Sequence, residues 1–76
     1  MKDIIMEILK NLDNGEAFEN SENFIDDGLI DSYQMVEIVD ELESEFDIEI
    51  SGRDIIPDNF VNLAAIETLV AKYTEG

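Results

Sequence analysis

Apolar residues recur at helical spacing in three segments of this 76-residue chain, and this spacing constrains the fold more than any other feature. Side chains three and four residues apart share one face of an α-helix, so each segment predicts a helix with one apolar stripe. Only the short run 48–50 alternates as a strand would. The three stripes consist of Ile4, Ile5, Ile8, Leu9 and Leu12; of Met35, Ile38, Val39, Leu42 and Phe46; and of Leu63, Ile66, Leu69, Val70 and Tyr73.

Residues that favour helix ends flank these stripes. Asn14-Gly15 is a stop signal for the first helix, and Asn62 is an N-cap residue for the third. The second helix has the strongest start, because Asp31 as N-cap and Gln34 three residues later complete a capping-box pattern. The three helices are therefore expected to begin or end at these positions.

Two connections join the predicted helices. The first, residues 13–31, is long for a compact domain, and its apolar residues are expected to pack across the helix ends: Phe18, Phe24, Ile25, Leu29 and Ile30. In the second, Ser51–Asp54 resembles a small capping box, and Pro57 interrupts any continuous helix before a short turn at 58–61. The sequence thus predicts an all-α fold, a small four-helix bundle of three main helices and one short helix, in a single domain spanning 1–76.

The composition indicates a folded but strongly acidic protein. Asp and Glu number 20 against 4 Lys and Arg, a net charge of −16. Leu, Ile, Val and Phe still supply 25 of the 76 residues, well above the roughly one-fifth that marks a disordered chain. Four scattered basic residues cannot follow a phosphate backbone, which argues against nucleic acid as a partner. No apolar run reaches the roughly 20 residues of a membrane span and no signal peptide opens the chain, so a cytoplasmic location is expected.

Two absent residue types narrow the chemistry. Without cysteine there is no disulfide, no thiolate metal site and no cysteine nucleophile. Without histidine the chain lacks the side chain most used as a general base near neutral pH. The acids also do not follow the oxygen-ligand loop of a calcium-binding hand, so no dedicated metal site is expected and a calcium-responsive protein is the weakest alternative. We expect no catalytic activity.

Ser32 is the most informative residue, because it follows Asp31 in the first turn of the predicted second helix. As a nucleophile it would need an activating base, and none lies beside it in the sequence. As the acceptor of a phosphate ester it is well placed, since unpaired amides and the positive end of a helix dipole favour a phosphate there. A phosphodiester installed by another enzyme requires no base within this chain.

The residues around Ser32 resemble those of acyl carrier proteins. The run Gly28-Leu29-Ile30-Asp31-Ser32 leads into an acidic amphipathic segment that ends in Glu45-Phe46-Asp47-Ile48-Glu49-Ile50, and helix order and the long first loop also agree. The resemblance implies that Ser32 carries 4′-phosphopantetheine, transferred from coenzyme A by a phosphopantetheinyl transferase. It further implies that Asp31 adjoins the attachment point and helps to place the metal ion used in the transfer. A monomer that meets a loading ligase and a downstream acyltransferase or synthase is expected.

The resemblance leaves the cargo open. Many fatty-acid carriers have leucine after the modified serine, whereas this chain has Tyr33. The Gly-Leu-Ile-Asp-Ser motif is more similar to the motif of stand-alone carriers of the D-alanyl and related aminoacyl kind. Fatty acyl, polyketide-type acyl and aminoacyl groups all remain candidates for the thioester that the arm would hold.

The charge pattern predicts a docking face on the second helix. Between Asn11 and Gly52 the chain has fourteen acids and no Lys or Arg. At about 100° per residue, one face turned away from the core would carry two apolar groups near Ser32 and acids beyond them: Tyr33, Val36, Glu37, Asp40 and Glu43. Such a face suits a partner with a basic rim and a small apolar pocket. The alternative from another class is a non-covalent acidic helical module that binds a basic partner.

Overall fold

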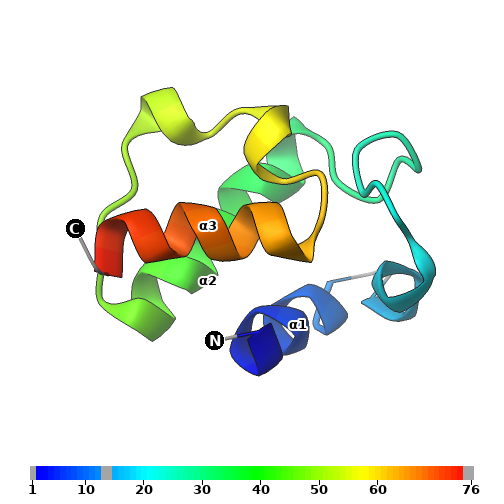
Figure 1. Cartoon of the computed structure of the whole chain (residues 1–76), viewed down its shortest axis with the longest axis horizontal. Helices are drawn as coiled ribbons and strands as arrows, with labels where there is room; N and C mark the ends of the chain where they lie inside the picture. The colour runs from blue at the N-terminus through cyan, green and yellow to red at the C-terminus, as the bar shows by residue number, and fades with distance from the viewer. Residues whose placement is uncertain (1, 13–14, 75–76) are drawn as a thin grey trace.

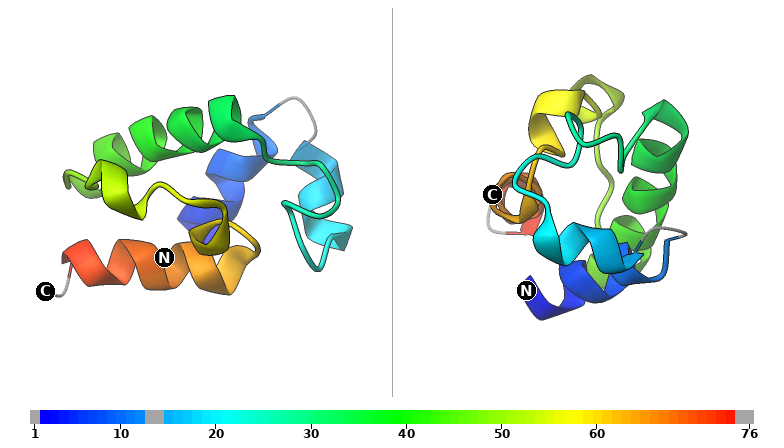
Figure 2. Two further views of the ribbon diagram at one scale, coloured as in Figure 1. Left: turned by 90° about the horizontal axis from the view of Figure 1, so that it is seen from above. Right: turned by 90° about the vertical axis from the view of Figure 1, so that its right-hand side faces the viewer.

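The computed structural model describes residues 2–12 and 15–74 and consists of helices. Three α-helices, α1 (Lys2–Lys10), α2 (Ser32–Phe46) and α3 (Leu63–Thr74), are joined by three 3₁₀ turns, η1 (Gly15–Asn20), η2 (Gly52–Asp54) and η3 (Pro57–Asn59) (Figure 1). The all-α prediction is confirmed, and the described ranges contain no strand. The helices α2 and α3 run along opposite sides of the molecule, and α1 packs against both (Figure 2).

The first helix is shorter than the predicted stripe. It ends at Lys10, and the amide of Leu12 then bonds to the carbonyl of Leu9 at 3.1 Å in a closing turn. Of the predicted stop signal, Gly15 begins η1 and Asn14 lies outside the described residues. Ile4, expected on the core stripe, is 39% exposed, and the buried residues of α1 are Ile5, Ile8 and Leu9.

The second helix begins and ends at recognisable caps. The Asp31 carboxylate accepts a hydrogen bond from the Gln34 amide at 2.8 Å, and the Gln34 side chain accepts one from the Asp31 amide at 3.2 Å. The predicted capping box is therefore confirmed. At the other end Asp47 takes the left-handed conformation with φ 54°, which stops the helix and turns the chain toward α3.

The predicted start of the third helix is also confirmed. The Asn62 side-chain oxygen accepts a hydrogen bond from the Ala65 amide at 2.8 Å. The single short helix expected before it is instead divided into η2 and η3. Ser51 caps η2 through the Arg53 amide at 3.4 Å, and Pro57 opens η3 because a proline is tolerated only in the first turn of a helix.

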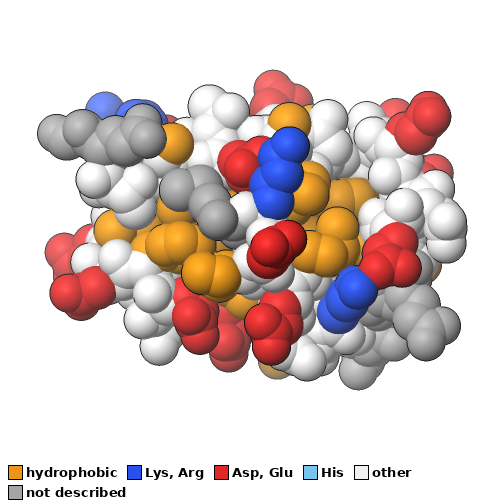
Figure 3. Space-filling model, turned by 60° about the horizontal axis from the view of Figure 1, so that its bottom comes forward, with side chains coloured by type: hydrophobic (Ala, Val, Ile, Leu, Met, Phe, Trp, Pro, Cys, Tyr) orange, Lys and Arg blue, Asp and Glu red, His pale blue; other side chains and the backbone are white. Residues whose placement is uncertain are grey.

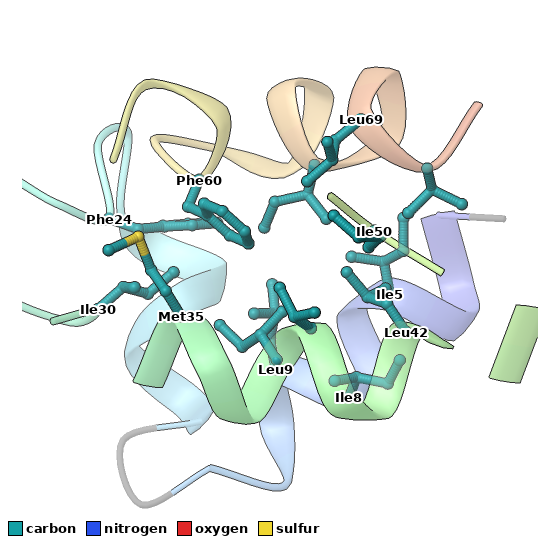
Figure 4. Close-up of a cluster of buried hydrophobic side chains, with 14 of the residues drawn as sticks. Ile5, Ile8, Leu9, Phe24, Ile30, Met35, Leu42, Ile50, Phe60 and Leu69 are labelled. Atoms are coloured by element: carbon teal, nitrogen blue, oxygen red, sulfur yellow. The ribbon is translucent and has the colours of Figure 1, made fainter. Parts of the chain in front are cut away.

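A single hydrophobic core joins all three helices and the long first connection (Figure 4). The connection supplies Phe18, Phe24 and Ile30, which are buried as the sequence predicted. The rings of Phe18 and Phe24 meet edge to face with centroids 4.8 Å apart, a favoured aromatic geometry. Of the predicted stripe residues, four are only half-buried and pack against the margin of the core: Leu12, Phe46, Leu63 and Tyr73. The first loop is thus part of the packed structure.

Ion pairs join the ends of the elements. Lys2 of α1 lies 3.8 Å from Glu67 of α3, Lys10 pairs with Glu19 of η1, and Lys72 of α3 lies 2.9 Å from Asp54 of η2. Each lysine of the chain thereby bridges two elements. The helix α2 itself contains no Lys or Arg. Within residues 2–12 and 15–74, no helix combines the length and the apolar character needed to cross a membrane.

Candidate functional site

Ser32 is the first residue of α2, and its side chain is exposed. Two residues earlier, Ile30 is buried in the core, and it anchors the chain just before the helix. The neighbouring Tyr33 is 72% exposed. The structure therefore presents the Ser32 hydroxyl to solvent at a position that the core holds firmly.

Backbone hydrogen bonds hold the loop before Ser32 in place. The amides of Leu29 and Ile30 both bond to the Phe24 carbonyl, at 2.9 and 3.3 Å, and the Phe24 amide bonds to the carbonyl of Val61 at 2.6 Å. Gly28 makes the required turn with φ +73°, a conformation that side chains with a Cβ rarely adopt. These bonds tie the approach to α2 onto the segment that precedes α3.

The capping box leaves two amides free for a ligand. In the first turn of an α-helix the backbone N–H groups have no partner within the helix. Here Asp31 and Gln34 satisfy each other's amides, which leaves those of Ser32 and Tyr33 at the positive end of the helix dipole. A phosphate attached to Ser32 would meet both groups, so the site fits a phosphodiester.

The chain supplies neither of the side chains that most often activate a serine or replace it as a nucleophile. The chain has no histidine or cysteine, so no imidazole base stands beside the hydroxyl. Across the described part of the chain, no group of three acidic side chains gathers closely enough to hold a metal ion.

The residues of the predicted docking face all lie on α2, in different environments. Tyr33 and Val36 are 72% and 53% exposed, and Asp40 is exposed as well. Glu37 is half-buried, and a hydrogen bond to its carboxylate holds the pKa of the Tyr33 hydroxyl above its ordinary value. Glu43 is half-buried too and accepts a hydrogen bond from the Ile50 amide at 2.8 Å. Glu43 therefore also holds the chain that leaves α2.

Two features of the surface were not predicted from the sequence. Hollows lie along the seam of α1 and α2, where Asn11 and Leu12 face Tyr33, Gln34 and Glu37. At the far end of the molecule Asp54 accepts hydrogen bonds from Tyr73 and Lys72, which hold the pKa of its carboxyl below its ordinary value. No local signal marks the first feature, because it depends on how α1 packs against α2. No local signal marks the second, because its partners are far apart in sequence.

Comparison with known proteins identifies the family. Neither the curated proteins nor the solved structures include a significant match to this chain. The family model described as "Phosphopantetheine attachment site" matches residues 1–70, which include Ser32 and all of α1 and α2. Such domains take 4′-phosphopantetheine covalently and serve as carriers. With the free hydroxyl at the start of α2 and the helical bundle around it, the chain belongs to the phosphopantetheine attachment family, as acyl carrier proteins do.

Proposed function

We propose that residues 1–76 form a single carrier domain that holds acyl or aminoacyl groups as thioesters and passes them between partner enzymes. The attachment point is Ser32. The observation that carries this proposal is the exposed hydroxyl beside two free amides at the start of α2. When bound, the phosphopantetheine arm supplies the thiol for the thioester, and the chain has no cysteine of its own.

Asp31 has two roles in this proposal. One of its oxygens, Oδ1, accepts the capping bond from the Gln34 amide. The other oxygen lies outside the capping box and is available to a magnesium ion during the transfer. Because one carboxylate cannot hold a metal alone, the remaining ligands would come from the diphosphate of coenzyme A and from the transferase. Asp31 is therefore a positioning residue for the attachment of the arm.

The outward face of α2 is the docking surface for the partner enzymes. Tyr33 and Val36 offer apolar area near Ser32, while Glu37, Asp40 and Glu43 supply negative charge farther along. A transferase, a loading ligase and a downstream acyltransferase or synthase with basic rims would be steered to this face. Charge complementarity raises encounter rates more than affinity, which suits a cytoplasmic monomer that must leave each partner quickly.

The residue that follows Ser32 favours an aminoacyl cargo over the other candidate cargoes. The leucine typical of fatty-acid carriers is replaced by Tyr33, whose ring is exposed and whose pKa is raised by the Glu37 carboxylate. A transferase or ligase that docks here meets a polar aromatic edge in place of an aliphatic one. Fatty acyl and polyketide-type acyl groups remain the competing cargoes.

A mass measurement tests the attachment. The purified chain is incubated with coenzyme A, magnesium and a broad-specificity phosphopantetheinyl transferase, and the intact protein is then weighed. We expect one phosphopantetheine adduct on the wild-type chain and none on Ser32→Ala. The matched control is Ser44→Ala, which removes another exposed serine of the same helix and should leave the adduct in place.

Two results would contradict the carrier proposal. A wild-type chain that stays unmodified favours the non-covalent acidic module, and an adduct that persists in Ser32→Ala places the arm elsewhere. Circular dichroism of each variant shows whether the helices have formed, so that loss of modification is not mistaken for loss of folding.

A further inference from the structure

The chain makes a tight turn at residues 24–28, shortly before α2 begins. Asn23, the residue before this turn, accepts three hydrogen bonds from it. Its side-chain oxygen Oδ1 accepts the amides of Ile25 at 3.1 Å and Asp26 at 2.9 Å. Its backbone carbonyl accepts the amide of Asp27 at 3.0 Å. Asn23 therefore caps the turn in the way that an N-cap residue caps a helix.

The chain that leaves this turn comes back to its beginning. The amides of Leu29 and Ile30 bond to the carbonyl of Phe24, the residue next to Asn23. The side chains of Phe24 and Ile30 are both buried in the core. The shape of the turn therefore sets the position at which Ile30 enters the core.

Ser32 is held between two buried side chains. Ile30 lies two residues before it and Met35 three residues after it, and Met35 is the first buried residue of α2. Figure 4 shows Phe24, Ile30 and Met35 at the same end of the core. The residues between the two anchors, 31–34, are exposed or half-buried. On the side of the loop, the position of the Ser32 hydroxyl therefore depends on Ile30.

In the part of the chain that the structure describes, the ion pairs of the lysines lie outside this turn. Lys2 bonds to α3 and Lys10 to η1, and in Figure 3 the two prominent cations each lie beside an acidic side chain. The Ser21 hydroxyl donates a bond to the Asp27 carboxylate in an exposed position, where water competes for both groups. Asn23 is half-buried and accepts three bonds, so it contributes more to the turn than this exposed contact.

We propose that Asn23 is a positioning residue for the attachment of phosphopantetheine to Ser32, an inference that rests on the proposed function. In this transfer the Ser32 oxygen forms a bond to the pantetheine-bearing phosphorus of coenzyme A, and the bond from that phosphorus to the bridging oxygen breaks. Adenosine 3′,5′-bisphosphate leaves with the electron pair, and a base of the transferase takes the hydroxyl proton. The attacking oxygen must lie in line with the leaving group, and a misplacement of about 1 Å can lower the rate about a hundredfold.

The loss of the Asn23 side-chain oxygen would act on this alignment. Two amides of the turn would lose their partner, and the chain at Ile30 would become free to move. The helix α2 would keep its capping box and its buried stripe, so the docking face would keep its shape. The effect should therefore fall on the transfer step and not on the binding of the transferase.

Steady-state kinetics of the attachment test this role. The chain is modified by a phosphopantetheinyl transferase with saturating coenzyme A and magnesium, and kcat and the KM for the chain are measured separately. We expect Asn23→Ala to lower kcat about tenfold and to change KM by less than about twofold. Asn23→Asp retains an accepting oxygen and should restore kcat to within about twofold of the wild type.

The matched control is Asn62→Ala. Asn62 accepts a hydrogen bond from the Ala65 amide at 2.8 Å through the same side-chain oxygen, so this variant removes the same kind of cap at the start of α3. Thermal unfolding should show a similar loss of stability in both alanine variants. Nevertheless, Asn62→Ala should keep kcat within about twofold of the wild type, because the turn before Ser32 remains capped.

Hydrogen exchange of the unmodified protein gives a readout that does not involve the transferase. In Asn23→Ala the amides of Leu29 and Ile30 should exchange about tenfold faster than in the wild type, because the turn that presents the Phe24 carbonyl opens more often. In Asn62→Ala the exchange of these two amides should stay within about twofold of the wild type.

Several results would overturn the positioning role alone. These are a wild-type kcat or wild-type exchange in Asn23→Ala, and an equal fall of kcat in Asn62→Ala, which would show an effect of stability only. A higher KM at unchanged kcat would make Asn23 a binding residue instead. A wild-type chain that accepts no phosphopantetheine would overturn the proposed function itself, whereas each of the other results leaves the attachment to Ser32 standing.

Discussion

Replacing Asp31 separates the structural role of this residue from its role in attachment. Asp31→Ala removes the carboxylate that accepts the Gln34 amide at 2.8 Å. Loss of an N-cap of this kind costs about 1 kcal/mol of stability, within a range of roughly 0.5–2 kcal/mol. The return bond, from the Asp31 amide to the Gln34 side chain, uses backbone atoms of residue 31 and can persist. We therefore expect a loss near the middle of this range.

The expected loss converts into a measurable melting shift. Unfolding gains about 2.1 cal/mol/K per residue, so a chain of 76 residues gains about 160 cal/mol/K. A loss of about 1 kcal/mol then lowers the Tm by about 6 °C. Asp31→Asn keeps an accepting oxygen at the cap, and asparagine caps helices about as well as aspartate. This variant should melt within about 2 °C of the wild type.

The assay combines thermal unfolding with the rate of modification. Both variants lack the free carboxylate oxygen, so both should accept phosphopantetheine about tenfold or more slowly than the wild type, although only Asp31→Ala is destabilised. An Asp31→Ala protein that melts with the wild type would refute the capping argument. An Asp31→Asn protein that is modified at the wild-type rate would refute the metal-positioning argument.

Two further predictions concern stability. Leu42→Ala empties a fully buried position and should destabilise the protein by about 2–5 kcal/mol in urea unfolding, whereas Val36→Ala on the exposed face should change it by less than about 0.5 kcal/mol; similar losses would refute the core assignment. Tyr73 and Lys72 hold the pKa of Asp54 below its ordinary value of 3.8, so the stability that this contact adds is complete above pH 3.8 and is lost as pH falls through the lower folded pKa. The difference in the free energy of unfolding between wild type and Tyr73→Phe, measured by urea unfolding at several pH values, should therefore be constant above pH 3.8 and shrink below it. A difference that stays constant below pH 3.8 would contradict the proposed effect of Tyr73 on Asp54.

The start of α2 could be predicted because its determinants are local. Asp31 and Gln34 lie three residues apart, and a capping box depends only on that spacing and on side-chain type. Asn62 predicted the start of α3 for the same reason. The end of α1 at Lys10 and the division of the short helix into η2 and η3 could not be read in this way, since both depend on how the connections pack against the core.

The apolar spacing and the cap residues by themselves determined the helix order, the inward stripes and the exposed serine at a helix start, because each follows from contacts within a few residues. The tertiary structure alone decided which acids gather along α1 and which point outward, since Glu7 and Glu41 line one hollow from positions 34 residues apart. It also decided that Glu43 bonds to the Ile50 amide and that Asp54 is held by α3. Such pairings depend on how helices cross, and helical periodicity along the chain carries no information about the distance between two separate helices.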